Sequence, residues 1–406
     1  MNSMRIMIFI FILFLVIEHF LKKYLIKTGL FLKEFPNIDK RIINRYKTFD
    51  KVLGWKPIPT LNHPDNTGSY IGINSGSFFS INEFGSRFFK NSFSSKYIAT
   101  FGDSFCMCRE VNDDCTFQYF LSQQTNSFVF NYGVGNYGLD QALLRFETTK
   151  LPPSVKHVIM VITPWTIERI ISIWKHYCEP GNLLAAKPRF VLENKKLKLI
   201  DNFIKNTSDF LNLKKYKDFL HNYDGNYCFF YQQLKTFPKT ALGYLFSNPD
   251  AIKYILAVSK IKSIKLEEKN RKEAIGSFLK QSEPFLLKKF YQENQYLQSL
   301  YDKQKELLKN ILKRFVESCV NDDKVPYLVF LPSYSHVKFI KQGNPLYRNI
   351  VNPICEGIGL NFIDGFNFWK TFDEDELKNC YIDTYGHHSK IGNKYIADLI
   401  YKTWFI

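Results

Sequence analysis

A serine that could act as a nucleophile stands directly after a short apolar segment of the chain. Tyr97–Phe101 leads into Gly102, Asp103 and Ser104. The apolar segment predicts a buried strand that enters a turn, and the residues after Ser104 predict a helix. A helix N-terminus favours negative charge, so this position suits a serine whose attack on a carbonyl creates an oxyanion. The alternative is a simple helix start, because Ser and Asp are common N-cap residues.

A base that could serve this serine lies near the other end of the chain. Asp383 is followed by His387, His388 and Gly392 within ten residues. A serine nucleophile needs a base within hydrogen-bond reach and a third group that orients the base, and such a loop can supply both. The alternative is a loop that caps the helix predicted after Gly392 and contains histidines by chance.

The elements that must position these residues follow a strand–helix alternation. Strands are predicted at 97–101, 127–131, 155–163, 325–331 and 360–363, and helices at 104–124, 139–150 and 291–320. This alternation predicts an α/β fold with a parallel sheet and crossover helices. In a doubly wound sheet the ligand lies beyond the carboxyl ends of the strands, which is where Ser104 falls.

The remaining organisation is predicted in five parts. Residues 1–23 read as a transmembrane anchor because Met4–Phe20 is almost entirely apolar, with a buried N-terminal helix as the alternative. The sequence predicts an irregular segment over 24–95 and the first half of the core over 96–169. It then predicts a helical insertion over 170–300 and the second half of the core over 301–406. The anchor predicts a single-pass protein of a bacterial inner membrane, and the Lys and Arg residues beside it weakly favour a cytoplasmic C-terminal side.

The charge and the cysteines narrow the class of partner. The net charge is +17, which fits anionic lipid headgroups, a polysaccharide, or simply a lysine-rich composition. No zinc knuckle, RNP-like sequence or basic helical stripe is present, so we expect no nucleic-acid partner. The eight cysteines form no CxxC pair and no Cys/His set with zinc spacing, so we expect no metal and no cofactor.

Three blocks of the sequence resemble the SGNH hydrolases, also called GDSL-like lipases and esterases. Gly102-Asp103-Ser104 is similar to the first block of the family, the segment Asn131–Gly138 to the second, and Asp383 with His387 and Gly392 to the last. The resemblance covers roughly 96–165 and 325–400, and it implies a flavodoxin-like three-layer α/β/α fold with metal-free ester chemistry. The segments Leu53–Pro57, Gly138–Gln141 and Lys187–Phe190 resemble a membrane-anchored bacterial subgroup.

The resemblance also implies a role for individual residues. Ser104 corresponds to the nucleophile, His387 to the general base and Asp383 to the residue that orients the base. Asp383 stands four residues before His387, one more than is usual in the family, so Asp364 is the alternative. Asn136 replaces a glycine of the second block, where its backbone N–H would face the oxyanion, and Thr166 is the best replacement for the asparagine of the third block.

The sequence therefore predicts an ester hydrolase or O-acyltransferase that acts through an acyl-enzyme on an acylated carbohydrate or lipid. Loss of one oxyanion donor costs other enzymes about 10²–10³ in turnover, so the missing third-block asparagine predicts slow catalysis. It also supports a second hypothesis, a catalytically impaired binding or assembly module in envelope polysaccharide production. A nucleic-acid surface is the third hypothesis and has the least support.

Overall fold

The computed structural model describes residues 2–27, 34–59, 79–88, 93, 96–179, 182–227, 241–242, 295–343, 347–382 and 386–406. The chain divides into two compact units. The sheet unit comprises Asp39–Ile173, Ala185–Asn212 and Gln295–Ile406, and the N-terminal unit comprises Met1–Ile38, Trp174–Leu184 and Leu213–Asn294.

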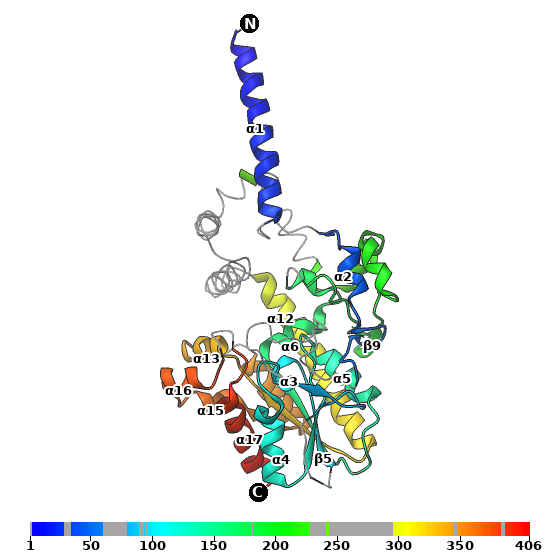
Figure 1. Ribbon diagram of the computed structural model, residues 1–406, viewed down its shortest axis with the longest axis vertical. Helices are drawn as coiled ribbons and strands as arrows, with labels where there is room; N and C mark the ends of the chain where they lie inside the picture. Colours follow the sequence, from blue (N-terminus) through cyan, green and yellow to red (C-terminus); the bar gives the residue numbers. More distant parts are fainter. Residues whose placement is uncertain are drawn as a thin grey trace. The chain divides into compact units, whose positions relative to one another are not determined.

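A mostly parallel sheet forms the centre of the sheet unit (Figure 1). Its strands are β3 (Ser80–Ile81), β4 (Arg87–Phe88), β5 (Lys96–Phe101), β6 (Phe128–Asn131), β7 (His157–Ile162), β10 (Val325–Phe330) and β11 (Asn361–Asp364). The spatial order is β11-β10-β7-β5-β6-β4-β3, with parallel pairing from β11 to β6 and antiparallel pairing of β4 with β6 and β3. Numbered along the chain, the five parallel strands have the order 2-1-3-4-5, which is the flavodoxin-like order. The predicted α/β class is confirmed, and the order reverses between β5 and β7.

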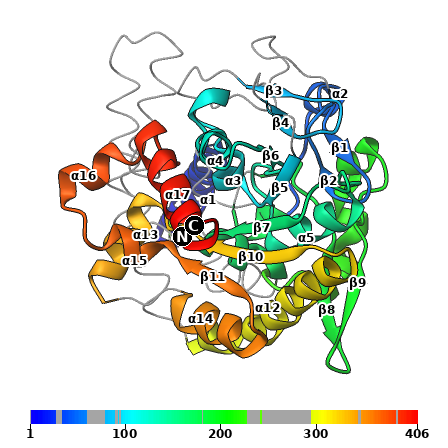
Figure 2. The ribbon, with the colours of Figure 1, turned by 90° about the horizontal axis from the view of Figure 1, so that it is seen from below.

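Helices cover both faces of this sheet, as Figure 2 shows. One face packs against α5 (Leu139–Thr148), α12 (Gln295–Asn321) and α14 (Arg348–Ile358), and the other against α4 (Phe117–Thr125), α13 (Tyr334–Lys341), α15 (Gly365–Trp369) and α17 (Lys390–Trp404). Neighbouring strand residues enter opposite cores: Ala99 belongs to the first and Ile98 to the second. This follows from the alternation of side chains along a strand, and it makes both faces of the sheet apolar.

The five predicted strands are all present, each displaced by at most three residues at an end. The helix predicted over 104–124 is instead broken into α3 (Ser104–Met107), a 3-10 turn η1 (Asp113–Cys115) and α4. The break begins at Cys108, which adopts left-handed φ 53° and ψ 46° and ends α3 after one turn. A non-glycine residue rarely adopts this conformation, and the contacts described below hold it.

Shorter elements connect the layers of the sheet unit. They are α2 (Lys40–Asn44), β1 (Phe49–Asp50), β2 (Gly54–Trp55), α6 (Pro164–Glu168), η2 (Arg169–Ile171), β8 (Arg189–Glu193), β9 (Lys196–Ile200), η4 (Thr207–Tyr216, which runs into the N-terminal unit) and α16 (Glu374–Asn379). The hairpin β8–β9 was not expected in a helical insertion. Asn194 and Lys195 form its two-residue turn with positive φ at both positions, which is the arrangement that matches the twist of paired strands.

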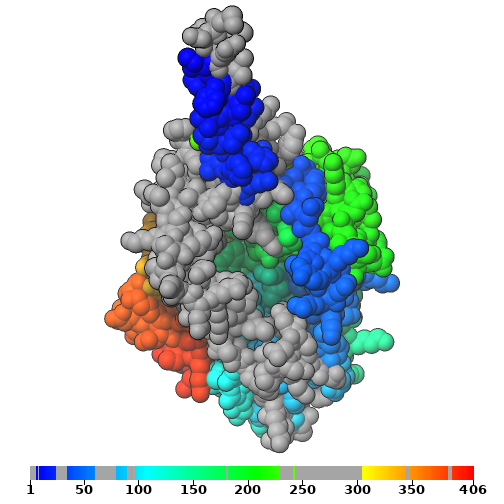
Figure 3. Space-filling view, turned by 45° about the horizontal axis from the view of Figure 1, so that its top comes forward, coloured from blue at the N-terminus to red at the C-terminus, as the bar shows by residue number. Residues whose placement is uncertain are grey.

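The N-terminal unit contains α1 (Asn2–Lys27), the 3-10 turn η3 (Lys175–Tyr177) and α7 (Lys217–Tyr223). Large apolar side chains of α1 between Ile6 and Phe20 are exposed (Figure 3). Glu18 accepts hydrogen bonds from the backbone N–H groups of Ala241 and Leu242. Among the residues described, no helix is long and apolar enough to cross a membrane, and the predicted transmembrane helix is not found.

Candidate active site

Ser104 is the first residue of α3 and follows β5 after a two-residue turn. The turn is tight because a Cβ on Gly102 would lie 2.6 Å from the carbonyl oxygen of Val161 and 2.8 Å from the Cβ of Cys106. Asp103 caps α3 by accepting a hydrogen bond of 2.9 Å from the N–H of Phe105. Ser104 therefore lies at the carboxyl end of a central strand. It is only 8% exposed, so it has little access to bulk water.

The carboxylate of Asp103 joins the ends of β5 and β7. It accepts a hydrogen bond of 3.0 Å from the hydroxyl of Thr163, and a guanidinium nitrogen of Arg169 lies 3.5 Å away. Burial raises the pKa of Asp103, while the charge of Arg169 opposes that shift. These contacts fix the backbone before Ser104 to the strand on the other side of the switch point, and they leave Asp103 occupied as a structural group.

His387 is the base that the structure brings to Ser104. Its Nε2 atom lies 2.7 Å from the Oγ of Ser104, although the two residues are 283 positions apart in the chain. The ring packs against Phe105, with centroids 4.7 Å apart. A backbone hydrogen bond of 3.0 Å from Ile382 to the carbonyl of His387 ties the loop back to the chain before it. The predicted convergence of Ser104 and His387 is therefore present in the geometry.

His388, the neighbouring histidine, belongs to the core instead. It is 3% exposed and stacks on Trp369 with ring centroids 5.6 Å apart. Neither of its ring nitrogens has a hydrogen-bond partner among the residues described, and burial, assisted by the charge of His387, lowers its pKa to about 3. This neutral, buried imidazole packs among Phe105, Trp369 and Tyr381.

A carboxylate that the sequence interpretation did not select lies beside His387. The Oε1 atom of Glu110 is 3.4 Å from the Nδ1 of His387. The same oxygen accepts hydrogen bonds from Arg109, 2.9 Å from Nε and 2.7 Å from a terminal nitrogen. Burial by itself would raise the pKa of Glu110, but the contact with His387 and the charge of Arg109 outweigh it and lower the pKa to about 2. Glu110 is therefore an anion at neutral pH.

Two aspartates, Asp383 and Asp364, were predicted as the residue that orients His387. Asp383 lies outside the described residues, so its role stays a prediction. Asp364 ends β11 and caps α15 through a hydrogen bond of 3.1 Å from the N–H of Phe366. It also forms a 2.7 Å ion pair with Arg348. Asp364 is thus held by structural contacts with α14 and α15, and the geometry does not support it as the alternative.

Arg87 on β4 holds the segment that carries Glu110. Its guanidinium donates hydrogen bonds to the carbonyls of Met107 (2.8 Å), Cys108 (2.7 Å) and Val111, and it forms a 2.7 Å ion pair with Asp113. The Arg87 side chain is 2% exposed. The carbonyls left without helical partners by the break after α3 are thereby satisfied. This contact comes from the segment 24–95, which the sequence showed only as irregular.

The turn after β6 supplies the other wall of the site. Gly133 is required there because a Cβ would lie 2.3 Å from the backbone nitrogen of Met107 in α3. Asn136 has φ 70°, within a turn closed by a 3.3 Å hydrogen bond from the N–H of Tyr137 to the carbonyl of Val134. Asparagine is one of the few residues other than glycine that tolerate this conformation. The backbone N–H groups of Ser104, Gly135 and Asn136 have no acceptor among the residues described.

Thr166 does not have the arrangement predicted for it. Its hydroxyl donates to the carbonyl of Thr163 at 2.7 Å and accepts from the N–H of Thr163 at 2.8 Å, as part of a capping box that begins α6. Thr166 is also completely buried. A hydroxyl has one proton to donate, so Thr166 cannot serve an oxyanion while this cap is formed. The backbone N–H groups named above are therefore the candidate oxyanion donors.

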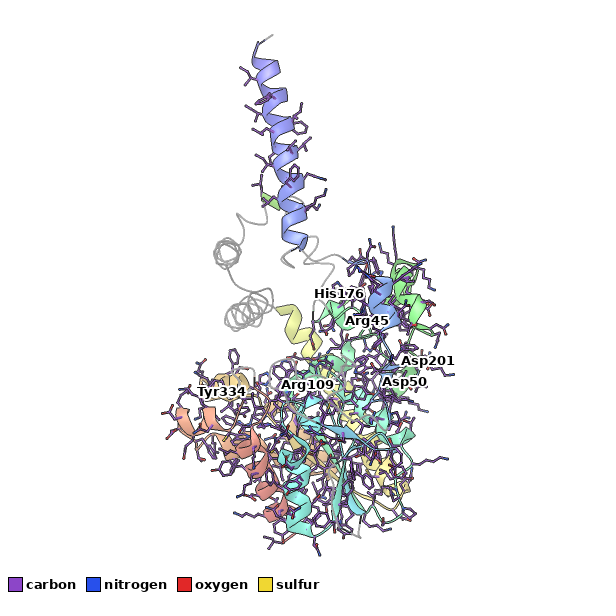
Figure 4. The ribbon with its side chains drawn as sticks, viewed as in Figure 1. Arg45, Asp50, Arg109, His176, Asp201 and Tyr334 are labelled. Carbon is purple, nitrogen blue, oxygen red and sulfur yellow. The ribbon has the colours of Figure 1, made fainter. Side chains whose placement is uncertain are left out.

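Figure 4 places Arg109 at the end of the sheet unit where the parallel strands terminate, the end at which Tyr334 begins α13 after β10. Ser104 follows β5 at this same end. Among the described residues, no group of three or more His, Cys, Asp or Glu side chains has the arrangement of a metal site. The site is a serine, an imidazole and a carboxylate in a row, with free backbone N–H groups nearby.

Comparison with known proteins adds a distant likeness to a solved structure. No family model matches the chain, and no curated protein matches it. Among solved structures, the chain is similar to a protein of Desulfitobacterium hafniense DCB-2 that is assigned to a lipolytic G-D-S-L family. The identity is 11%, the TM-score is 0.35, and the match covers 76% of this chain and 99% of the other. The likeness is too remote to assign a role to any residue.

Proposed function

We propose that this protein is a serine ester hydrolase or O-acyltransferase that works through an acyl-enzyme on Ser104. The observation that carries the proposal is the 2.7 Å contact between Ser104 Oγ and His387 Nε2. Nucleophile and base within hydrogen-bond reach at the carboxyl ends of parallel strands is the geometry that acyl transfer needs. The resemblance of the sequence blocks to SGNH hydrolases supports the same chemistry.

The reaction would proceed in two balanced steps. His387 Nε2 takes the proton of Ser104 as Oγ attacks the ester carbonyl, and the negative charge on the carbonyl oxygen is received by backbone N–H groups of Ser104 and of the Gly135–Asn136 turn. Collapse of this intermediate breaks the ester bond, and the imidazolium returns the proton to the leaving alcohol. Water or a sugar hydroxyl then loses its proton to His387 as it attacks the acyl carbon; the acyl–Oγ bond breaks, and the imidazolium returns the proton to the Oγ of Ser104.

The substrate class is part of the proposal and comes from the family resemblance: an acylated carbohydrate or lipid. Hydrolysis and transfer share every step up to the acyl-enzyme and differ only in the acceptor. The acceptor is therefore decided by supplying each in turn, with product analysis after incubation of an acylated oligosaccharide with and without a second sugar.

The test of the proposal uses Ser104→Ala with p-nitrophenyl acetate and a fluorophosphonate probe. We expect the wild-type protein to turn over the ester and to be labelled at Ser104, and Ser104→Ala to lose about 10⁴-fold or more of kcat, since removal of a serine nucleophile has effects of this size. Ser335→Ala, a serine on α13, is the matched control and should behave as wild type. Equal turnover by wild type and Ser104→Ala would refute the proposal.

One observation favours a second function, a binding or assembly module that keeps the fold without the activity. Thr166 is engaged in the α6 cap, so its hydroxyl does not take the place of the third-block asparagine as an oxyanion donor. Folded wild-type protein that resists the fluorophosphonate probe at millimolar concentration would favour this module. Labelling at Ser104 would exclude it.

A further inference from the structure

We propose that Glu110 is the residue that positions His387, so that the acid of the triad lies on the same loop as the nucleophile. This inference rests on the proposed function for the reaction it serves. The geometry that carries it is the 3.4 Å separation between Glu110 Oε1 and His387 Nδ1, with Ser104 on the opposite ring nitrogen. An acceptor at Nδ1 holds the proton there, which leaves Nε2 free to accept the proton of Ser104.

The environment of Glu110 fits an orienting carboxylate. Its side chain is 11% exposed and that of His387 is 17% exposed, so both groups are largely buried but keep some contact with water. The two hydrogen bonds from Arg109 hold the carboxylate of Glu110 in place beside the imidazole of His387. The lowered pKa of Glu110 agrees with an anion that gains from both neighbours. Arg109 is therefore the cation that holds Glu110 beside His387.

Among the described residues, the other titratable groups near His387 have partners or surroundings of their own. Asp103 is paired with Thr163 and Arg169. His388, on the loop itself, is buried and turned toward Trp369. Among the described residues, Glu110 is thus the carboxylate within 4 Å of the ring.

The helix break after α3 is what makes this arrangement possible. In a continuous helix Glu110 would follow Ser104 by six residues, roughly two thirds of a turn out of phase with it, and would project from another face. The left-handed Cys108 instead turns the chain back toward α3, so that both Ser104 and Glu110 reach the same imidazole. The position of the acid is therefore set by a backbone turn and not by sequence spacing to the histidine.

The experiment compares Glu110→Gln with Asp383→Asn in the full chain, with Asp114→Asn as the matched control. Asp114 is an exposed acid four residues further along the same segment. We expect Glu110→Gln to lose on the order of 10⁴-fold in kcat with little change in KM, comparable to loss of the acid in other triads. Asp114→Asn should change neither quantity.

A second readout does not depend on activity. With ¹⁵N-labelled histidine and His387→Ala to assign the signal, the chemical shift of the His387 Nδ1–H proton should change in Glu110→Gln, because its acceptor is altered, and stay unchanged in Asp114→Asn. A Glu110 that does not hold the imidazole would leave this signal in place while activity fell. Glu110→Asp, which keeps the charge on a shorter side chain, should recover part of both effects.

The two failures can be told apart. If Ser104 is neither active nor labelled but the His387 Nδ1–H signal still changes in Glu110→Gln, the positioning contact stands and the proposed reaction falls. If wild type is active, Glu110→Gln keeps its kcat and its Nδ1–H signal, and Asp383→Asn changes both, the acid lies on the histidine loop and the inference is overturned.

Discussion

Arg87 is the residue whose loss tests the architecture of the site most directly. Replacement by methionine keeps the length and apolar volume of the side chain but removes the guanidinium. The substitution leaves the carbonyls of Met107, Cys108 and Val111 without their donor. It also leaves Asp113 without its 2.7 Å partner, in a place where burial already raises its pKa. We therefore expect both stability and catalysis to suffer.

The size of the effect follows from burial. Arg87 is 2% and Asp113 13% exposed at the side chain. Removal of one partner of a buried ion pair costs about 3–5 kcal/mol, a large share of the roughly 5–15 kcal/mol that keeps a domain folded. For a unit of this size, about 2 °C of melting temperature accompanies each kcal/mol, which predicts a fall of about 6–10 °C. Asp113→Asn keeps the carbonyl contacts of Arg87, so its loss should be smaller.

The assay is thermal unfolding followed by tryptophan fluorescence, with kcat for p-nitrophenyl acetate measured well below the melting temperature. Arg87→Met should lose most of its kcat even where it is fully folded, because the segment that carries Glu110 is no longer held. Arg41→Met is the control, since Arg41 pairs with Asp39 at the surface with side chains 86% and 39% exposed, and should leave melting unchanged. A fall below about 2 °C for Arg87→Met, which corresponds to only about 1 kcal/mol, would refute the reasoning.

Three further predictions follow from the geometry of the site. Gly133→Ala should cost about 1–3 kcal/mol and most of the activity, measured by urea unfolding and kcat, because the added Cβ would stand 2.3 Å from the nitrogen of Met107; unchanged kcat would contradict the close approach. Asn136→Gly should keep kcat if the backbone N–H is the oxyanion donor, whereas a loss of about 10²-fold would assign that role to the amide side chain. The pKa of His388 is lowered to about 3 by burial, so between the ordinary value of about 6.5 and pH 3 the unfolded chain binds a proton that the folded chain does not, and stability falls as the pH falls. His388→Phe should therefore remove about 2 kcal/mol of acid destabilisation at pH 5, which corresponds to 1.5 pH units at 1.36 kcal/mol each. The urea midpoint of each protein is measured at pH 8 and at pH 5, and an equal fall of the midpoint in both proteins would contradict this.

The sequence by itself determined the parallel sheet and the two ends of the site. Apolar segments such as 155–163 are long enough and apolar enough to require burial on both faces, and the alternation with helices restricts their connection. Ser104 and His387 could be selected because each follows a recognisable boundary: the end of a buried strand and a loop before a helix. The long amphipathic helix at 295–321 was visible for the same reason, a sustained helical period.

Only the tertiary structure decided which groups surround Ser104 and His387. Cys108 carries no turn signature, so its left-handed conformation could not be read locally; the Thr116 cap that restarts the helix as α4 was the one available signal. Arg87 comes from a segment without periodicity and reaches across the sheet edge to fix the 107–113 turn. Thr166 was predicted to be an oxyanion donor, but its hydroxyl donates to the carbonyl of Thr163 in the α6 cap. A local pattern fixes where strands and helices form, whereas the partner of each polar group depends on segments that meet only after the sheet has assembled.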